Sequence, residues 1–526
     1  MISNAVEEVV KRYFESAGAR IIPEDVPRIH VDEIAARIAK FYERVRNIID
    51  YKDEHLLRKS FVNRVFRRRL LLGTGSGVGE AIIKETIRAG HLKNDSVPET
   101  KSVEIDRLIS NYRILVQNLP ALKNGERGRV IAWLSEIASN AIEEALFPPV
   151  KDLSLADLMF RSIRKHVLVR GANLSSETLD AQVFIGVQRA LLNADRDQLH
   201  YRIFTYMTPG WQTMSEEEAR SLSPRLPALK NTIERLLRHR LAPQFFRLAN
   251  RYHSIFNLIG DVLENTHSIE SFKALVENES ELEGEVERAY NARFKKARKR
   301  LNRMAFLSVL SFLISKIAVA IAVEVPLETY LTGDFSVRNI VINIVVPPLL
   351  MFLIVMFIRL PGRKNFPLVM DEIKNVVLED RNPKYILDIP KKRNPFTESV
   401  IRLIYAAIII TVFYYLILGL LSFGFNAANI AIFIFFVSMV CATGVKIHNR
   451  AKDLSLEKRR VSFIMFLVDL VSMPFVAIGR AILAGLAKFN PIVLMINLIV
   501  EAPFQVFVGF LENFRGFIKA KKEEIT

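Results

Sequence analysis

The chain has 526 residues, of which 50% are hydrophobic and 25% charged, and its formal net charge at pH 7 is +17. Such an excess of positive charge can indicate nucleic-acid binding, but here many of the cations flank long apolar segments, so membrane topology explains it and we expect no nucleic-acid partner. The single cysteine, Cys441, excludes an intrachain disulfide and a cysteine metal cluster.

The first 303 residues carry apolar side chains at spacings of three and four, which predicts helices throughout. A polar stretch around Pro98 predicts a linker, so we divide this half into a basic helical region, 1–92, and a helical domain, 103–303. The first 20 residues include three glutamates and no apolar core, so we expect no secretory signal peptide. The domain ends in a stalk helix, about 268–303, which lacks proline and can continue directly into the membrane.

From Met304 onward the sequence, 304–526, contains apolar segments long enough to cross a bilayer, because about 20 apolar helical residues span its hydrocarbon core. The predicted spans lie near 304–325, 340–358, 403–423, 427–445, 461–486 and 491–511. Charged residues and prolines interrupt the last two, so an interfacial hairpin is the alternative there. The sequence therefore predicts an all-α protein, with a helical cytoplasmic N-terminal domain followed by a polytopic membrane bundle of about six spans.

Lysines and arginines gather in the segments that the six-span topology places on one side of the membrane. By the positive-inside rule this side is cytoplasmic, so we expect both termini in the cytoplasm, with a bacterial inner membrane as the simplest location. Seven cations directly before the first span are candidate contacts of anionic lipid headgroups: Arg293, Lys295, Lys296, Arg298, Lys299, Arg300 and Arg303.

Charged side chains inside the predicted spans mark a candidate site, because each costs about 2.5 to 3.5 kcal/mol at a helix centre on insertion scales. The predicted intramembrane polar site comprises Lys316, Asn343, Asp469 and Glu501. Lys316 and Glu501 have similar predicted depths and can pair. Asn339, Asn343 and Pro347 share a face of the proline-broken second span, a feature of transporter sites. The alternative is a buried ion pair that only fixes helix register.

A run of alternating glycines, Gly73, Gly75, Gly77 and Gly79, is a candidate anion loop because it precedes a predicted helix and follows three arginines. Its spacing is not G-x-G-x-x-G, and the alternating strands of a dinucleotide-binding fold are missing from the pattern. A flexible loop between helices is therefore the favoured interpretation. For the basic stretch 58–69, an ordinary packed helix is favoured over a lipid or nucleic-acid contact.

No hydrolase, metal-binding or nucleotide-binding motif stands out, so we expect no catalytic residue, no metal ligand and no cofactor. The first hypothesis is a non-enzymatic, membrane-anchored interaction or organising protein, whose cytoplasmic protein partner binds residues 1–303. The second is a secondary transporter or channel that uses the intramembrane charges and the proline-broken helices. A membrane-embedded enzyme acting on lipid ranks third.

Overall fold

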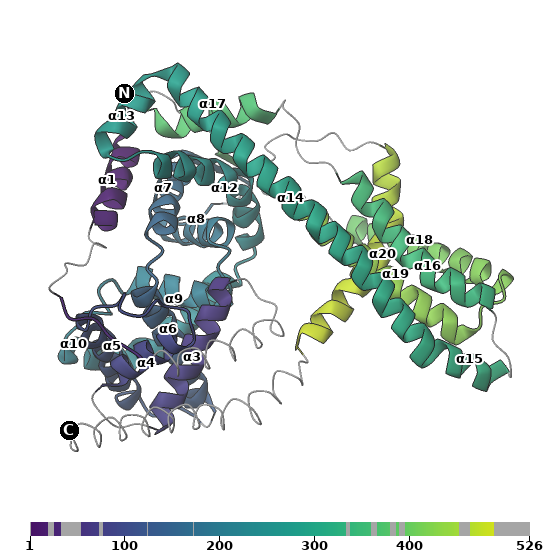
Figure 1. The fold of residues 1–526 in the computed structure, drawn as a ribbon, viewed down its shortest axis with the longest axis horizontal. Helices are drawn as coiled ribbons and strands as arrows, with labels where there is room; N and C mark the ends of the chain where they lie inside the picture. Colours follow the sequence, from purple (N-terminus) through teal and green to yellow (C-terminus); the bar gives the residue numbers. More distant parts are fainter. Residues whose placement is uncertain are drawn as a thin grey trace, which may run out of the picture. The chain divides into compact units, whose positions relative to one another are not determined.

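The computed structural model describes residues 2–18, 26–32, 54–72, 77–123, 125–171, 173–332, 337–358, 365–378, 385–388, 395–451 and 463–488. Within these residues the regular structure is helical, except for one two-stranded sheet in which β1 (Val167–Arg170) pairs with β2 (Tyr385–Asp388) (Figure 1). This confirms the predicted all-α class. The chain divides into two compact units, which are described separately.

The N-terminal unit comprises the described residues of Asn4–Val167 and Asn173–His253. Its helices are α1 (Asn4–Gly18), α3 (Glu54–Leu72), α4 (Val78–Arg88), α5 (Thr100–Gln117), α6 (Glu126–Leu146), α7 (Val150–His166), α8 (Ser176–Leu191), α9 (Arg196–Met207), α10 (Glu216–Leu222), the 3-10 turn η1 (Ser223–Arg225), α11 (Leu226–Leu237) and the first half of α12 (Ala242–Asn265). A capping box opens α10, since the Glu218 amide donates to Ser215 Oγ and the Ser215 amide to the Glu218 carboxylate.

Aliphatic and aromatic side chains from α3, α4, α5, α6 and α9 form the core of this unit. Phe66, Ile83, Ile137 and Phe204 are each at most 1% exposed. Both tryptophans of the chain, Trp133 and Trp211, also lie in this core. Burial of these faces explains why the three-to-four periodicity of the sequence corresponds to helices here.

The C-terminal unit comprises the described residues of Met1–Ser3, Leu168–Ala172 and Ser254–Asn490. Besides the end of α12 and the strands, its elements are α13 (Ile269–Glu277), α14 (Glu279–Val319), the π-helical turn η2 (Ala320–Glu324), α15 (Val325–Thr332), α16 (Val337–Phe357), α17 (Asn365–Val377), α18 (Pro395–Ser422), α19 (Ala427–Ala451) and α20 (Phe463–Lys488).

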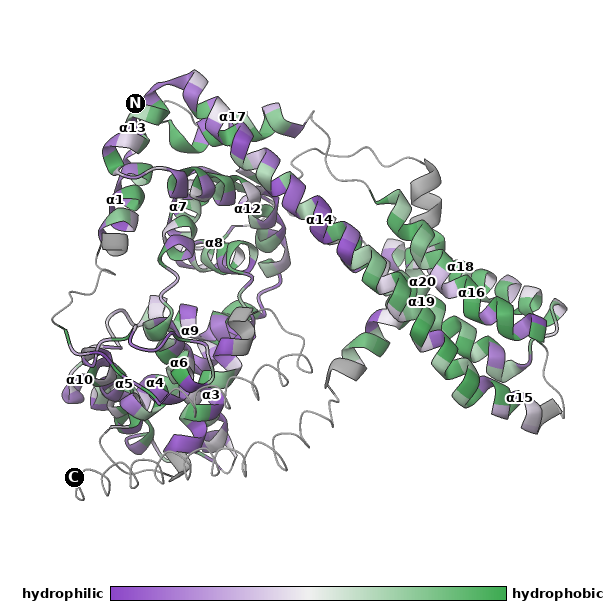
Figure 2. Cartoon of the chain, in the orientation of Figure 1, coloured by the Kyte–Doolittle hydropathy of each residue, from purple (hydrophilic) through white to green (hydrophobic). Residues whose placement is uncertain are grey.

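Four helices of this unit are long and apolar enough to cross a membrane, which places the chain among membrane proteins. They are the continuous helix 279–330, Val337–Phe357, Phe396–Ser422 and Ala427–His448, and Figure 2 shows their apolar stretches. They coincide with the first four predicted spans. In the fifth, α20 includes the apolar stretch Leu470–Gly485. The sixth, 491–511, lies outside the described residues.

The stalk helix continues into the first span, as predicted. α14 runs through Met304 without a break, and its surface changes from hydrophilic to hydrophobic along its length (Figure 2). The predicted start of this helix near residue 268 is wrong, because the helix is interrupted at Asn278. This residue leaves the helical conformation, and its side chain caps α14 by accepting from the Glu281 amide at 3.4 Å.

Candidate functional site

Lys316 lies in the apolar part of α14 and is completely buried, at 0% exposure. Its ammonium donates to the carboxylate of Glu324, which is 1% exposed and lies eight residues further along the same helix. A charge taken out of water is costly unless an opposite charge or hydrogen bonds compensate it. The pair therefore satisfies within one helix two ionic groups that the hydrocarbon surroundings would otherwise disfavour.

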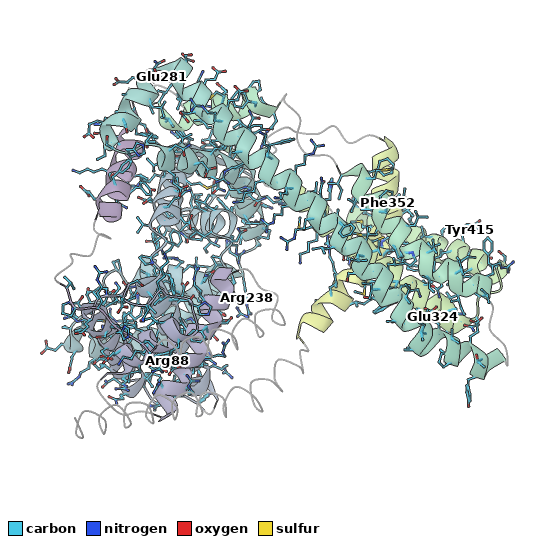
Figure 3. The ribbon with its side chains drawn as sticks, viewed as in Figure 1. Arg88, Arg238, Glu281, Glu324, Phe352 and Tyr415 are labelled. Atoms are coloured by element: carbon cyan, nitrogen blue, oxygen red, sulfur yellow. The ribbon has the colours of Figure 1, made fainter. Side chains whose placement is uncertain are left out.

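The π-helical turn Ala320–Glu324 explains how residues eight apart can pair. In a regular α-helix residues seven apart are about 20° from alignment, whereas the eighth lies on another face. A π-turn holds one additional residue, so the residues after it shift by about one position. Glu324 thus reaches the face of α14 that carries Lys316. Figure 3 labels Glu324 on this helix.

Two other helices complete this cluster, which we call the Lys316 cluster: Lys316, Glu324, Asn343 and Phe436. Asn343 on α16 donates its Nδ2 to the second carboxylate oxygen of Glu324 at 3.0 Å. Lys316 Nζ lies 4.7 Å from the ring centroid of Phe436 on α19, within the range of a cation–π contact. Both oxygens of Glu324 are therefore bonded, and the cluster joins three membrane helices.

Asn343 also carries a polar atom of the cluster that lacks a hydrogen bond. Its Oδ1 is buried without a hydrogen-bond partner among the described residues. Rotating the amide would place this oxygen against the Glu324 carboxylate, so the observed orientation is the favourable one. The cluster can hold helices in register and offers a single buried acceptor, but its two charges neutralise each other.

The structure brings together two of the four residues predicted for the intramembrane site, Lys316 and Asn343. Asp469 lies in α20, with its side chain outside the described part, and Glu501 is also outside it. The partner of Lys316 in the described structure is Glu324, which sequence reasoning missed because it stands at the predicted end of the first span. Its spacing of eight residues from Lys316 is meaningful only with a π-turn between them.

The polar face predicted on α16 is present and ties this helix to a turn. Asn339, Asn343 and Pro347 are all buried. Asn339 Nδ2 donates to the Gly424 carbonyl at 2.9 Å, in the turn between α18 and α19. Gly424 has a φ of +85°, a conformation that favours glycine, so α18 and α19 are joined by a tight turn at this position.

Six of the seven predicted lipid-contacting cations are exposed on α14, and none of them forms an ion pair with a residue that the structure describes. We call them the α14 cations: Lys295, Lys296, Arg298, Lys299, Arg300 and Arg303. Arg293 differs, because its guanidinium binds the Asp261 carboxylate at 2.7 Å and the Asn257 carbonyl at 3.1 Å, both on α12. Arg293 therefore has a partner within its own unit.

The predicted anion loop is described only at its end, since Gly73 and Gly75 lie outside the described residues. Gly77 precedes α4 with a φ of +90°. The Gly79 amide donates to the Asp106 carboxylate at 2.8 Å, and a side chain at Gly79 would collide with the Ser102 carbonyl. An external anion at this helix start would have to displace Asp106.

The arginines near that loop also have partners in the N-terminal unit. Arg68 and Arg69 both bind Glu85, which is 5% exposed, and Arg67 binds Glu136 at 3.2 Å. Further back on α3, Lys59 is buried and binds Asp195 at 2.7 Å. The basic stretch is thus part of a packed helix with internal ion pairs.

Comparison with known protein families, curated proteins and solved structures found no match. Across the described ranges, no group of three or more His, Cys, Asp or Glu side chains is placed to hold a metal ion.

Proposed function

We propose that this chain is a non-enzymatic, membrane-anchored interaction or organising protein, whose N-terminal helical unit binds a cytoplasmic protein partner. The observation that carries this proposal is the closed arrangement of the Lys316 cluster. Lys316 and Glu324 are buried and bonded to each other. Asn343 and Phe436 contact them from two other helices, so the charges of the first span hold helices together. The N-terminal unit, by contrast, exposes large side chains such as Val103 and Tyr206 that a partner could contact.

The burial of the pair argues against an ion-carrying role. A transported ion must reach its binding groups from water on one side and leave on the other. Glu324 has both oxygens bonded, to Lys316 and to Asn343, and Lys316 has no exposed surface. An ion entering here would have to break a charged pair and a hydrogen bond before gaining any contact.

A transporter or channel is the second candidate, favoured by one observation. The π-turn Ala320–Glu324 lies beside the open Oδ1 of Asn343, and π-turns within helices are frequent at functional sites. In this alternative, opening of the pair would expose Glu324 to an ion.

The α14 cations support the proposed placement of the N-terminal unit on the cytoplasmic side, with a bacterial inner membrane as the proposed location. Each exposed cation near an anionic leaflet contributes about 1 kcal/mol of attraction, so these side chains would contact lipid headgroups as the first span enters the bilayer. Because α14 is one continuous helix, the headgroup region and the membrane core are connected without a loop.

A variant without the buried charges, Lys316→Met/Glu324→Gln, separates the two functions. Purified wild-type chain in liposomes is expected to give no flux of H⁺, Na⁺, K⁺ or Cl⁻ above empty vesicles. In native membranes, a photo-cross-linking amino acid placed in turn at exposed positions of the N-terminal unit, such as Val103 and Tyr206, should capture the same partner from the wild type and the variant.

The control position for cross-linking is Tyr330, which is 86% exposed and lies in the other unit. A partner captured equally well from Tyr330 would not be specific to the N-terminal unit. Wild-type flux that disappears in the charge-free variant, with its elution profile unchanged, would establish transport and overturn the proposal. Absence of any reproducible partner from every N-terminal position would also count against it.

A further inference from the structure

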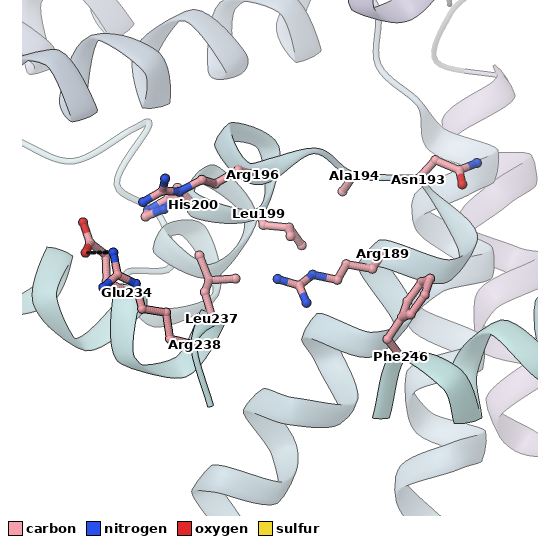
Figure 4. A pocket seen from close by; sticks show the side chains of 10 residues that line it. All are labelled: Arg189, Asn193, Ala194, Arg196, Leu199, His200, Glu234, Leu237, Arg238 and Phe246. Carbon is pink, nitrogen blue, oxygen red and sulfur yellow. Dashed lines mark ion pairs between the residues drawn. The ribbon is translucent and has the colours of Figure 1, made fainter. Parts of the chain in front are cut away.

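The N-terminal unit contains a cavity of about 500 Å³ between α8, α9, α11 and α12. Three arginines line it, Arg189 from α8, Arg196 from α9 and Arg238 just after α11 (Figure 4). The only acidic residue in its lining is Glu234. The volume lies within the usual range of small-molecule pockets, about 300–1,000 Å³.

Arg189 has no partner among the residues that the structure describes. Its guanidinium extends toward Leu199 and Leu237 (Figure 4), and it forms no hydrogen bond or ion pair with any described residue. Partial burial lowers its pKa from the ordinary value, because the charged form loses hydration without gaining an anion. A partly buried arginine that faces a cavity without a bound anion can donate hydrogen bonds to an anionic ligand.

The one acid in the lining does not neutralise the cavity. Glu234 binds Lys230 at 2.7 Å and Arg238 at 3.5 Å, so its single charge is shared between two cations of its own helical segment. A neighbouring cavity of about 320 Å³ shares Glu234, Arg196 and Arg238, and its lining adds the cations Arg129 and Lys230 and one further acid, Glu126. The positive surroundings therefore extend beyond the first cavity.

His200 adds a neutral donor to the same cavity. Its Nδ1 accepts a hydrogen bond from Trp133 Nε1 at 3.0 Å, and an indole nitrogen can only donate. The proton of the neutral imidazole is therefore on Nε2. Burial, and secondarily the charge of Arg196, lower the pKa of His200, which agrees with a neutral ring.

We infer that this cavity binds a phosphorylated organic anion, with the phosphate at Arg189, Arg196 and Arg238. Guanidinium groups bind phosphate oxygens through paired hydrogen bonds, and they keep their charge at any physiological pH. The apolar part of the ligand would contact three further lining side chains: Leu199, Leu237 and Phe246. This inference does not depend on the proposed function, because it rests only on the side chains that line the cavity.

Isothermal titration calorimetry on the full-length chain in detergent micelles tests the site with two probes. ATP without magnesium represents soluble phosphates, and dioctanoyl phosphatidic acid represents lipid headgroups. Binding of only one probe identifies the source of the phosphate, and binding of either supports the site. The Arg189→Gln variant is expected to bind about 10- to 100-fold more weakly, because hydrogen bonds to a charged group are lost.

The matched control is Arg235→Gln, on α11. Arg235 is exposed, donates only to Thr232 at 2.9 Å and does not line the cavity, so its affinity should equal that of the wild type. Arg189→Gln should fold normally because Arg189 bonds to no side chain in the described part of the chain, and the fluorescence of Trp133 and Trp211 checks this. Lack of binding of both probes to the wild type overturns the inference. So does unchanged affinity in folded Arg189→Gln, or an equal loss in Arg235→Gln.

Discussion

The Lys316–Glu324 pair predicts a specific pattern of stability among three variants. In Lys316→Met the Glu324 carboxylate stays buried with only the Asn343 hydrogen bond, and in Glu324→Gln the ammonium of Lys316 loses its counter-charge. Removing one partner of a buried ion pair costs about 3–5 kcal/mol, whereas replacing both by uncharged groups of similar size is often close to neutral. We therefore expect both single variants to be strongly destabilised, and Lys316→Met/Glu324→Gln to recover most of the loss.

The single cysteine provides the assay. Cys441 lies in α19, is 8% exposed and belongs to the same unit as the pair. Because no other thiol exists in the chain, the rate of labelling by a maleimide reports opening of this unit alone. Labelling rates are measured in detergent micelles with increasing SDS. A loss of 3–5 kcal/mol corresponds to labelling about 10² to 10⁴ times faster when opening limits access.

The exposed cation Lys299, on the same helix, is the control. Lys299→Gln should change the opening free energy by no more than about 0.5 kcal/mol, because surface substitutions have small effects. Two results would refute the structural interpretation of the pair. One is a Lys316→Met or Glu324→Gln variant as stable as the wild type, and the other is a double variant less stable than either single variant.

Three further predictions concern other buried positions. Burial raises the pKa of Glu143 from 4.5 to about 7, and the charge of Arg58 opposes this shift. The folded state therefore keeps a proton that the unfolded state releases, so stability falls as the pH rises from 4.5 to 7. Glu143→Gln should remove this loss, up to about 3 kcal/mol, in denaturant titrations followed by tryptophan fluorescence; an unchanged pH slope would contradict the assignment. Burial lowers the pKa of His91 from 6.5 to about 4, so this group lowers stability as the pH falls from 6.5 to 4 and opposes the effect of Glu143 where the two windows overlap. His91→Asn should therefore make stability fall more steeply as the pH rises from 4.5 to 6.5 in the same titration, and an unchanged slope would contradict the assignment. A side chain at Gly479 on α20 would overlap the Ser438 carbonyl on α19, so Gly479→Val should accelerate Cys441 labelling. Gly485→Ala should not, because a side chain there meets nothing within 4 Å. Equal labelling rates in the two variants would show that α19 and α20 are not in close contact.

Local sequence patterns were sufficient for the elements whose environment is uniform along their length. The apolar stretches after Met304, the hairpin at Gly424 and the buried face of α16 all follow from composition and periodicity. A bilayer permits few solutions for such segments, because every backbone polar group must be bonded internally. Helix formation in the N-terminal unit follows in the same way from the three-to-four repeat.

The contacts that form the Lys316 cluster and the arginine-lined cavity could not be predicted from the sequence. The partner of Lys316 depends on a π-turn, which shifts the helix by one residue and leaves no mark in an apolar run such as 317–323. The arginine-lined cavity depends on Arg189, Arg196 and Arg238, which lie on three successive segments with no shared motif. Their convergence is a tertiary result, and the absence of a partner for Arg189 appears only when all neighbours are known.

The Lys316 cluster also limits which motions α14 can transmit. Rotation of this helix about its axis would separate Glu324 from Asn343 and Lys316 from Phe436, because these partners lie on α16 and α19. Losing a hydrogen bond to a charged group costs about 1.5–3 kcal/mol, so a ligand would need a preference of about 10- to 100-fold for the rotated state to stabilise it. Tilting or bending of α14 on the polar side of the cluster, where the six α14 cations are exposed, breaks none of these bonds. Any signal along this helix should therefore change the contacts of the α14 cations while Lys316 and Glu324 remain paired.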